Sequence, residues 1–227
     1  MNLLQIPIIK RLYPSIVRRI FIFFGRIKFT FKIQNYFFDL DIRESIERKA
    51  YFEKSYEKLR MNFLIKKSKE MRSEIFIDIG AYIGFYSIIM SKIFTKIYSF
   101  EPQKRNFKIL EQNIFKNNLN HKIITYNLGL GNKIENLYGG SNRKGKLLQS
   151  SGFAIKKSGS EKISINIGDK LLKISNKIIT IKIDVEGFEF NVLRGIRQIL
   201  SNNKCLLQIE IWDKNYNDIC TFLNNLK

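Results

Sequence analysis

The first group of residues that could do chemistry is the run Asp78-Ile79-Gly80-Ala81-Tyr82-Ile83-Gly84, which begins inside the almost wholly apolar segment Ile75–Ile79 and leaves it. Such a short apolar segment is typical of a buried parallel strand, and the glycines favour a tight turn into a helix. Glycine also lets a ligand approach the backbone, and amides at the start of the helix would face that ligand. The run lacks the third glycine of the dinucleotide-binding fingerprint, so it does not indicate a pyrophosphate site.

Asp78 favours a ligand that carries an ammonium group and no phosphate. S-adenosylmethionine has such a group, and it has a sulfonium besides. A plain strand-to-helix turn would explain one glycine of the run, but not both glycines together with an aspartate at the strand end.

The second candidate is Glu101, which follows the segment Lys96–Phe100 and precedes Pro102. A carboxylate at the end of the second strand of such a unit, roughly 20 residues beyond the glycines, accepts hydrogen bonds from ribose hydroxyls. The alternative is a solvated strand-end glutamate. Glu101 comes after the Asp78 run in the sequence at this spacing, which favours the ribose role.

The third candidate is the run Lys182-Ile183-Asp184-Val185-Glu186-Gly187-Phe188-Glu189, after the apolar segment Ile178–Ile181. Carboxylates at a strand's carboxyl end lie where open α/β sheets bind ligands, and their clustering favours a base or a hydroxyl-orienting role. Alternatively, Glu189 caps the next helix and Glu186 is solvated, so that only Asp184 faces the site.

Alternating strands and helices from Glu74 onward must position these residues. The segments read as strands are 75–79, 96–100, 122–126, 163–167, 177–184 and 204–212, and those read as helices are 85–94, 103–117, 189–200 and 216–226. This alternation predicts an open, doubly wound α/β sheet of the Rossmann type. Residues 139–160 are rich in Gly, Ser and Lys, which predicts a mobile loop that closes over the acceptor substrate.

Residues 1–73 form a separate extension in this interpretation, and residues 74–227 form the ligand-binding domain. Ile8–Phe24 reads as a basic amphipathic helix, either on a membrane surface or packed against the domain or a second subunit. Lys28–Ile33 and Tyr36–Leu40 alternate around Gln34-Asn35 and predict a hairpin. Arg43–Lys69 is helical in composition, with a break near Ser55, and its expected buried positions are Ile46, Tyr51, Phe52, Leu59, Phe63 and Leu64.

Together the stretches FIDIGAYIGFYS (76–87), YSFEPQKRNFKILEQNI (98–114), IKIDVEGFEFNVLRG (181–195) and LQIEIW (207–212) resemble the FkbM methyltransferase family. The resemblance implies a class I methyltransferase fold, S-adenosylmethionine as the methyl donor, and O-methylation of a sugar or natural-product hydroxyl. It places Asp78, Gly80 and Gly84 at the methionine end of the cofactor, Glu101 at the ribose, and Asn127 and Leu128 by the adenine. Asp184 and Glu186 would face the transferred methyl group as catalytic candidates. Ala81, Tyr82, Phe85, Tyr86 and Pro102 complete the expected cofactor-binding set.

Two departures from the family pattern bear on this expectation. Family members continue into two further strands after the helix that here spans 216–226, so we expect an uncovered sheet edge, which invites pairing with a second chain. Tyr82 stands where the family usually has asparagine, and its ring could narrow or reshape the pocket. A non-catalytic relative that serves as a binding or membrane-associated module therefore stays open.

The chain has 227 residues and a formal net charge of +20. Either composition drift or an anionic partner explains this charge, and a nucleic-acid methyltransferase is the alternative enzyme, although no Asn-Pro-Pro-Tyr motif is present. No run is long enough to span a membrane, and Cys205 and Cys220 show no metal or disulfide spacing. The lone His121 favours a surface turn. We therefore expect a cytoplasmic enzyme, either free or peripheral to the membrane, that needs no metal and acts on a carbohydrate hydroxyl rather than on nucleic acid.

Overall fold

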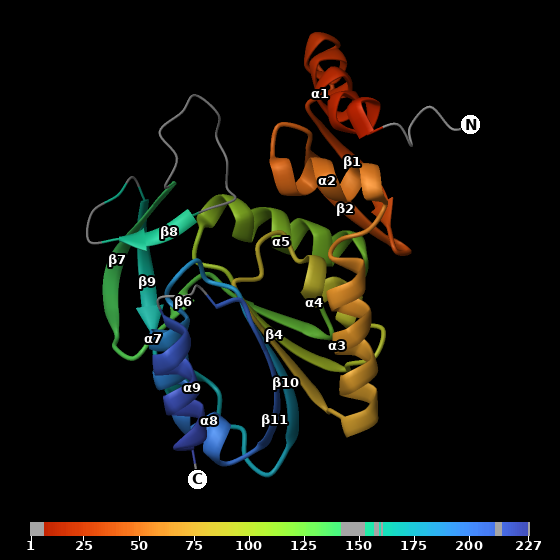
Figure 1. Cartoon of the computed structure of the whole chain (residues 1–227). Helices are drawn as coiled ribbons and strands as arrows, with labels where there is room; N and C mark the ends of the chain where they lie inside the picture. The colour runs from red at the N-terminus through yellow and green to blue at the C-terminus, as the bar shows by residue number, and fades with distance from the viewer. Residues whose placement is uncertain (1–6, 142–152, 157–158, 160, 212–214, 227) are drawn as a thin grey trace.

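A parallel sheet of five strands forms the centre of the structure (Figure 1), which is a computed structural model describing residues 7–141, 153–156, 159, 161–211 and 215–226. The strand order is β11-β10-β3-β4-β5, and the bounds are β3 Ile75–Ile79, β4 Lys96–Phe100, β5 Ile123–Tyr126, β10 Ile178–Ile183 and β11 Lys204–Ile209. After β3 the chain adds β4 and β5 on one side of this strand, and it later adds β10 and β11 on the other side. Strand order therefore reverses between these two strands, where open sheets form a ligand crevice. The predicted α/β class is confirmed.

Helices cover both faces of the sheet, and each face has its own apolar core. Alternate strand residues point to opposite faces, so Phe76 packs on one side and Ile77 on the other. One core holds α3 (Lys58–Met71), α4 (Phe85–Met90) and α5 (Lys104–Lys116). The other holds α7 (Glu189–Gly195), α8 (Arg197–Ser201) and α9 (Tyr216–Asn224), next to the short α6 (Gly168–Leu171).

A second sheet replaces part of the predicted loop. Its order is β6-β9-β7-β8, with bounds β6 Gly129–Leu130, β7 Glu135–Ser141, β8 Phe153–Lys156 and β9 Glu161–Asn166. Gly139 and Gly140 are therefore strand residues paired with β8 and β9, and the prediction of a loop from residue 139 was wrong there. The remainder of the predicted lid, residues 142–152, 157–158 and 160, lies outside the described residues.

The N-terminal extension consists of α1 (Pro7–Phe23), the hairpin β1 (Lys28–Ile33) and β2 (Tyr36–Asp41), α2 (Ser45–Glu53), and then α3. The hairpin and the break near Ser55 agree with the sequence. The turn residues Gln34 and Asn35 both have positive φ, as a two-residue hairpin loop requires. Leu59 and Phe63 are 86% and 62% exposed, because α3 buries a stripe that is shifted by two residues and begins at Met61.

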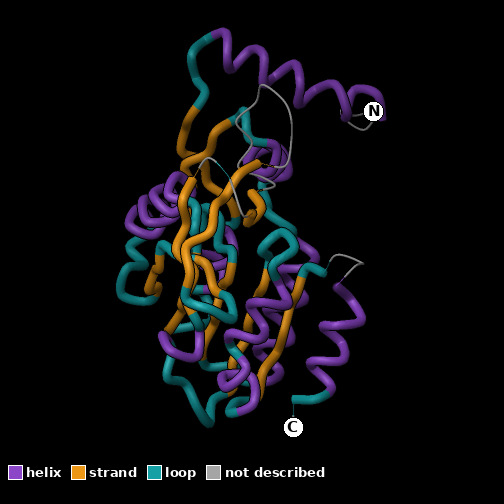
Figure 2. Tube along the Cα trace, turned by 90° about the vertical axis from the view of Figure 1, so that its left-hand side faces the viewer, coloured by secondary structure: helices purple, strands orange, loops and turns teal. Residues whose placement is uncertain are grey.

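The hairpin is fixed to α5 by side-chain amides. Asn113 Oδ1 accepts a hydrogen bond from the Asp39 amide at 2.8 Å, and Asn117 bonds both the N–H and the C=O of Phe37. These bonds satisfy backbone groups of a hairpin edge strand and tie the extension to the sheet domain. Figure 2 shows α1 at the far end of this extension, away from the central sheet.

Several expected absences concern only the part of the chain that the structure describes. There, no helix is long and apolar enough to cross a membrane, and no group of three or more His, Cys, Asp or Glu side chains could hold a metal ion. The outer edge of β11 has no paired strand among these residues. His121 lies exposed in a turn, and Cys205 and Cys220 are free thiols.

Candidate functional site

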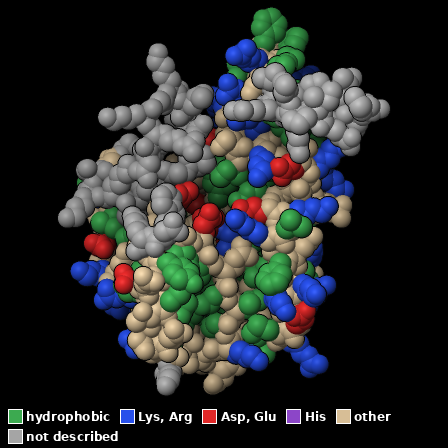
Figure 3. All heavy atoms as spheres, in the orientation of Figure 1, with side chains coloured by type: hydrophobic (Ala, Val, Ile, Leu, Met, Phe, Trp, Pro, Cys, Tyr) green, Lys and Arg blue, Asp and Glu red, His purple; other side chains and the backbone are tan. Residues whose placement is uncertain are grey.

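A pocket opens at the carboxyl ends of β3, β4 and β10, where strand order reverses. Ten of the residues expected at the site line it: Asp78, Gly80, Ala81, Tyr82, Phe85, Tyr86, Glu101, Pro102, Asp184 and Glu186. The sheet topology brings these three separate sequence stretches together. Figure 3 shows acidic side chains close to one another near the middle of this face, below the extension.

Three expected residues lie outside the pocket lining. Gly84 begins α4 with φ +93°, and a Cβ there would meet Leu110 at 2.6 Å, so this glycine serves helix packing. Asn127 donates a hydrogen bond to the backbone carbonyl of Glu101 at 2.9 Å. Leu128 packs against the core on the α7 face. Their neighbours Gly129 and Leu130 line the pocket instead.

A glycine is required at position 80 because the turn after β3 lies directly against the backbone that follows β10. The φ of Gly80 is +85°, and a Cβ would lie 1.9 Å from the carbonyl oxygen of Asp184. The Gly80 and Ala81 amides both donate to the Phe100 carbonyl at 2.9 Å, which draws the β3 turn onto the end of β4. These two turn amides are thus already used within the protein.

Asp78 is fully buried at the floor of the pocket. Its Oδ2 accepts hydrogen bonds from the Ser87 amide at 3.0 Å and the Ser87 hydroxyl at 2.5 Å. Its Oδ1 is buried and has no hydrogen-bond partner among the described residues. Burial raises the pKa of Asp78, because the charged form loses water. A ligand donor at Oδ1 would satisfy this oxygen.

Glu101 is buried at the end of β4 and holds two backbone segments. Its Oε2 accepts from the Tyr82 amide at 2.8 Å, and its Oε1 accepts from the Gln103 amide at 2.9 Å. Burial raises the pKa of Glu101 to about 8, against the lowering effect of these two bonds. The Asn106 side chain also hydrogen-bonds this carboxylate, so one of its four acceptor positions remains for a further donor.

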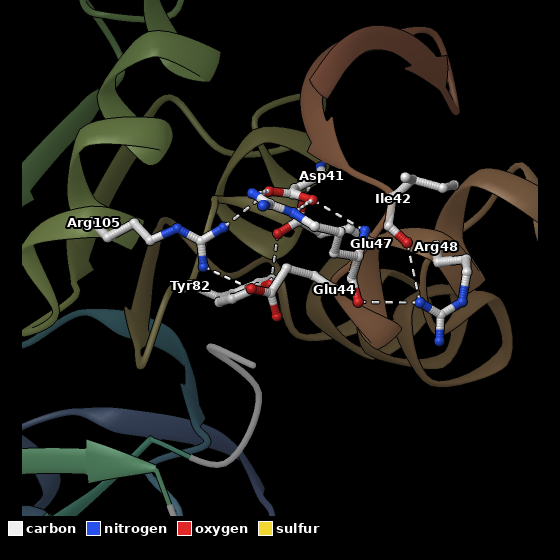
Figure 4. A network of polar contacts seen from close by, with 8 residues as sticks. Asp41, Ile42, Glu44, Glu47, Arg48, Tyr82 and Arg105 are labelled. Atoms are coloured by element: carbon white, nitrogen blue, oxygen red, sulfur yellow. Dashed lines mark hydrogen bonds and ion pairs between the residues drawn. The ribbon is translucent and has the colours of Figure 1, made fainter. Parts of the chain in front are cut away.

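Tyr82 connects the pocket to the N-terminal extension (Figure 4). Its backbone has φ +54°, and its hydroxyl donates to Glu47 of α2 at 2.7 Å. Burial raises the pKa of Glu47 to about 7. Arg105 of α5 joins the same network through ion pairs with Glu44 at 2.7 Å and Asp41 at 3.5 Å. The extension thereby fixes the Tyr82 side chain.

Lys182 is a pocket residue for which the sequence reasoning gave no role. Its ammonium bonds Asp184 at 2.9 Å and lies 4.8 Å from the centre of the Tyr86 ring. Although the side chain is buried, the nearby carboxylates Asp184 and Asp78 leave the pKa of Lys182 raised. A lysine inside an otherwise apolar strand is the signal that could have identified it.

The extension and β11 supply further residues that sequence reasoning did not assign to the site. Ile46 of α2 and Tyr56 line the pocket, and Tyr56 stacks on Phe85 with ring centres 4.4 Å apart. The Tyr86 hydroxyl donates to Glu57 at 2.8 Å and accepts from Gln208 of β11 at 2.9 Å. These contacts are non-local, so no spacing in the sequence announces them.

Comparison with known proteins gives one family. The family model described as "Methyltransferase FkbM domain" matches residues 78–226, more than half of the chain. The fold is similar to methyltransferase FkbM from Methylobacillus flagellatus KT, with 20% identity, a TM-score of 0.52, and coverage of 68% of this chain and 38% of that chain. This chain therefore spans well under half the length of that protein.

Weaker similarities extend to two archaeal structures. One is the tRNA m1G37 methyltransferase of M. jannaschii, at 22% identity and TM-score 0.34, covering 46% of this chain and 31% of that chain. The other is Trm5b of Pyrococcus abyssi, at 14% identity and TM-score 0.45, covering 88% and 46%. No curated protein sequence matches the chain.

Proposed function

The chain belongs to the FkbM methyltransferase family, and we propose from this that it methylates a hydroxyl group of a sugar, a glycan or a related metabolite. Membership of the family makes S-adenosylmethionine its cofactor. In this proposal residues 74–227 form the cofactor-binding domain, and residues 1–73 form an extension that lines one side of the pocket. The enzyme works in the cytoplasm.

The observation that carries the proposal is the set of buried acceptors at the carboxyl edge of the sheet. Glu101 would accept a hydrogen bond from a ribose hydroxyl through its remaining lone pair. Asp78 Oδ1 would accept from the ammonium group, which supplies the partner this oxygen lacks among the described residues. Pro102, Gly129 and Leu130 form the apolar wall beside Glu101 and suit the adenine. Asn127 would act from behind that wall by holding the Glu101 backbone.

The protein's part in the reaction is to orient an acceptor hydroxyl and to take its proton. When bound, S-adenosylmethionine supplies an activated methyl group on its sulfonium. Asp184 has one oxygen fixed by Lys182, and its other oxygen would accept the hydrogen bond of the acceptor hydroxyl. As the new C–O bond forms and the S–C bond breaks, Asp184 or Glu186 would take the hydroxyl proton.

The pocket chemistry favours an uncharged acceptor group over a phosphate. Asp184 and Glu186 line the pocket where the acceptor would lie, and a phosphodiester beside these two carboxylates would meet like charge. The net charge of +20 supports the alternative of a nucleic-acid substrate. That alternative predicts binding to RNA that weakens steeply with salt.

The test is transfer of a labelled methyl group from S-adenosylmethionine to a panel of acceptors. The panel contains nucleotide sugars, oligosaccharides, lipid-linked sugars and total tRNA. With the accepted substrate, Asp184→Asn or Glu186→Gln should lower turnover roughly 100-fold while cofactor binding persists, and the exposed control Glu135→Gln should not. Methylation of tRNA alone would replace the proposal. Full turnover by both pocket variants would remove the assigned base.

A further inference from the structure

The outward side of α1 carries an uncovered apolar stripe. Ile16, Ile20, Phe23 and Phe24 are 52%, 48%, 84% and 69% exposed, and their spacing puts them on one side of the helix. The other side is fixed to the protein, because the Phe21 ring lies 5.3 Å from Phe29 and 6.0 Å from Tyr51. The two interpretations that the sequence left open therefore apply to different sides of α1. One side packs against the protein, and the other side is exposed.

The segment around this stripe carries only positive charge. Residues 1–38 contain no acidic residue, and all 20 Asp and Glu residues of the chain lie beyond them. The basic residues of the segment are Lys10, Arg11, Arg18, Arg19, Arg26, Lys28 and Lys32. Figure 3 shows hydrophobic and basic side chains next to one another at this projecting end. Composition drift would have spread acids into this segment as well.

We propose that α1 and the adjoining hairpin dock on an anionic lipid surface. An apolar stripe beside Lys and Arg side chains is the pattern of a helix that lies in the membrane interface. The basic residues complement the negative surface of anionic lipids. A second copy of this chain docked on the stripe would bring a segment with seven basic and no acidic residues against an identical segment. A nucleic acid would leave the Phe23 and Phe24 rings without an apolar partner. This inference does not depend on the proposed methyl transfer.

The docked helix would hold the pocket near the lipid headgroups. Tyr51 of α2 contacts Phe21 of α1, and Ile46 of the same helix lines the pocket. One short helix therefore separates the lipid-facing stripe from the site, and Figure 1 shows α1 and α2 at the same end of the molecule. This placement suits an acceptor whose hydroxyls are displayed at a bilayer surface.

Flotation of the full chain with vesicles tests the proposal. One set of vesicles is pure phosphatidylcholine. The other is a mixture of phosphatidylcholine and phosphatidylglycerol at about 70:30. We expect binding to the anionic vesicles at least about ten-fold stronger than to the neutral ones, and weaker binding as salt is raised. Replacing Phe23→Ser and Phe24→Ser together should weaken it about ten-fold or more. The matched control Leu59→Ser with Phe63→Ser removes two equally exposed apolar side chains from α3 and should change nothing.

Three results would overturn the proposal. The first is no binding to anionic vesicles by a chain whose folding is verified by circular dichroism. The second is equal loss of vesicle binding in the α1 variant and the α3 control. The third is a dimer in sedimentation equilibrium that the α1 variant abolishes without any vesicle binding, which would identify a second copy as the occupant. Salt-sensitive binding to RNA without vesicle binding would instead favour a nucleic acid.

Discussion

Lys182 is the single residue on which the electrostatics of the pocket most depend. Its ammonium bonds Asp184 and interacts electrostatically with Asp78, and both the lysine and Asp78 are buried. Removal of one partner from a buried ion pair leaves the other charge uncompensated, which costs more than the pair contributes. Lys182→Met should therefore lower the free energy of unfolding by about 3 kcal/mol, as measured by urea denaturation.

A matched control exists for this prediction. Lys177 forms an ion pair of similar length, 2.8 Å, with Glu74, but both side chains are half exposed. Lys177→Met should cost less than about 1 kcal/mol. Adding Asp184→Asn to Lys182→Met should recover part of the lost stability. Equal effects of the two lysine variants would contradict the role given to Lys182.

The sequence predicted the acidic pocket residues better than it predicted their partners. Asp78 lies near the end of an apolar strand, and Glu101 and Asp184 each follow one. Parallel strands end at one edge of the sheet, so the meeting of these residues could be inferred. The Lys182–Tyr86 contact and the bond from Tyr82 to Glu47 join residues distant in the chain. Only the packed fold brings these groups together, and no spacing encodes them.

At the scale of secondary-structure elements, the junction of β3 and β10 depends on Gly80. In Gly80→Ala a Cβ would overlap the Asp184 carbonyl, and the residue would keep a positive φ. Gly187→Ala is the control, since Gly187 has φ +98° but nothing within 4 Å of its Cβ position. We expect Gly187→Ala to cost about 1 kcal/mol and Gly80→Ala to cost about 3 kcal/mol or more in denaturant unfolding. A cost for Gly80→Ala no larger than that of the control would contradict this account of the turn.

The bond between α2 and the first motif is the second prediction at this scale. Tyr82→Phe removes the hydroxyl that donates to Glu47, so a buried carboxyl loses one partner. We expect a loss of about 1–3 kcal/mol in stability and weaker cofactor binding, because the Tyr82 amide also holds Glu101. Thermal unfolding and calorimetry measure the two effects. Tyr138→Phe, at an exposed tyrosine, should show neither, and wild-type behaviour of Tyr82→Phe would separate the extension from the site.

Elements defined by local pattern were predictable, and elements defined by distant pairing were not. The hairpin around Gln34-Asn35 and the apolar strands β3 and β10 carry their own periodicity and turn signals. Residues Gly139–Ser141 look like a loop by composition, yet they pair with β8, and Gly139 also pairs with β9. Leu59 and Phe63 are apolar but exposed, because packing selects the stripe that includes Met61, Leu64 and Ile65.

The whole molecule should lose stability as pH rises from 5 to 8. Burial raises the pKa of Glu47 to about 7 and of Glu101 to about 8, from 4.5. The folded chain therefore keeps protons that the unfolded chain releases above pH 4.5, and the stabilisation present at low pH is lost up to pH 8. The expected fall in unfolding free energy is on the order of a few kcal/mol.

Glu47→Gln isolates one part of this pH effect. The glutamine can accept from the Asp41 amide with its oxygen and donate to the Tyr82 hydroxyl with its nitrogen, so the bonds persist without a titrating group. Denaturation at pH 5, 6, 7 and 8 should give a flatter curve for this variant. A wild-type curve that rises across the window would contradict the burial assigned to these carboxyls.

Calorimetric binding of S-adenosylmethionine and S-adenosylhomocysteine tests the central claim most directly. We predict micromolar binding that Glu101→Ala weakens by about ten-fold or more, since a buried donor left without its acceptor costs roughly 1–3 kcal/mol. Glu135→Ala, at an exposed position outside the pocket, should bind as the wild type does. No binding of either ligand to the folded chain, or equal binding by Glu101→Ala, would contradict the assignment of this pocket to the cofactor.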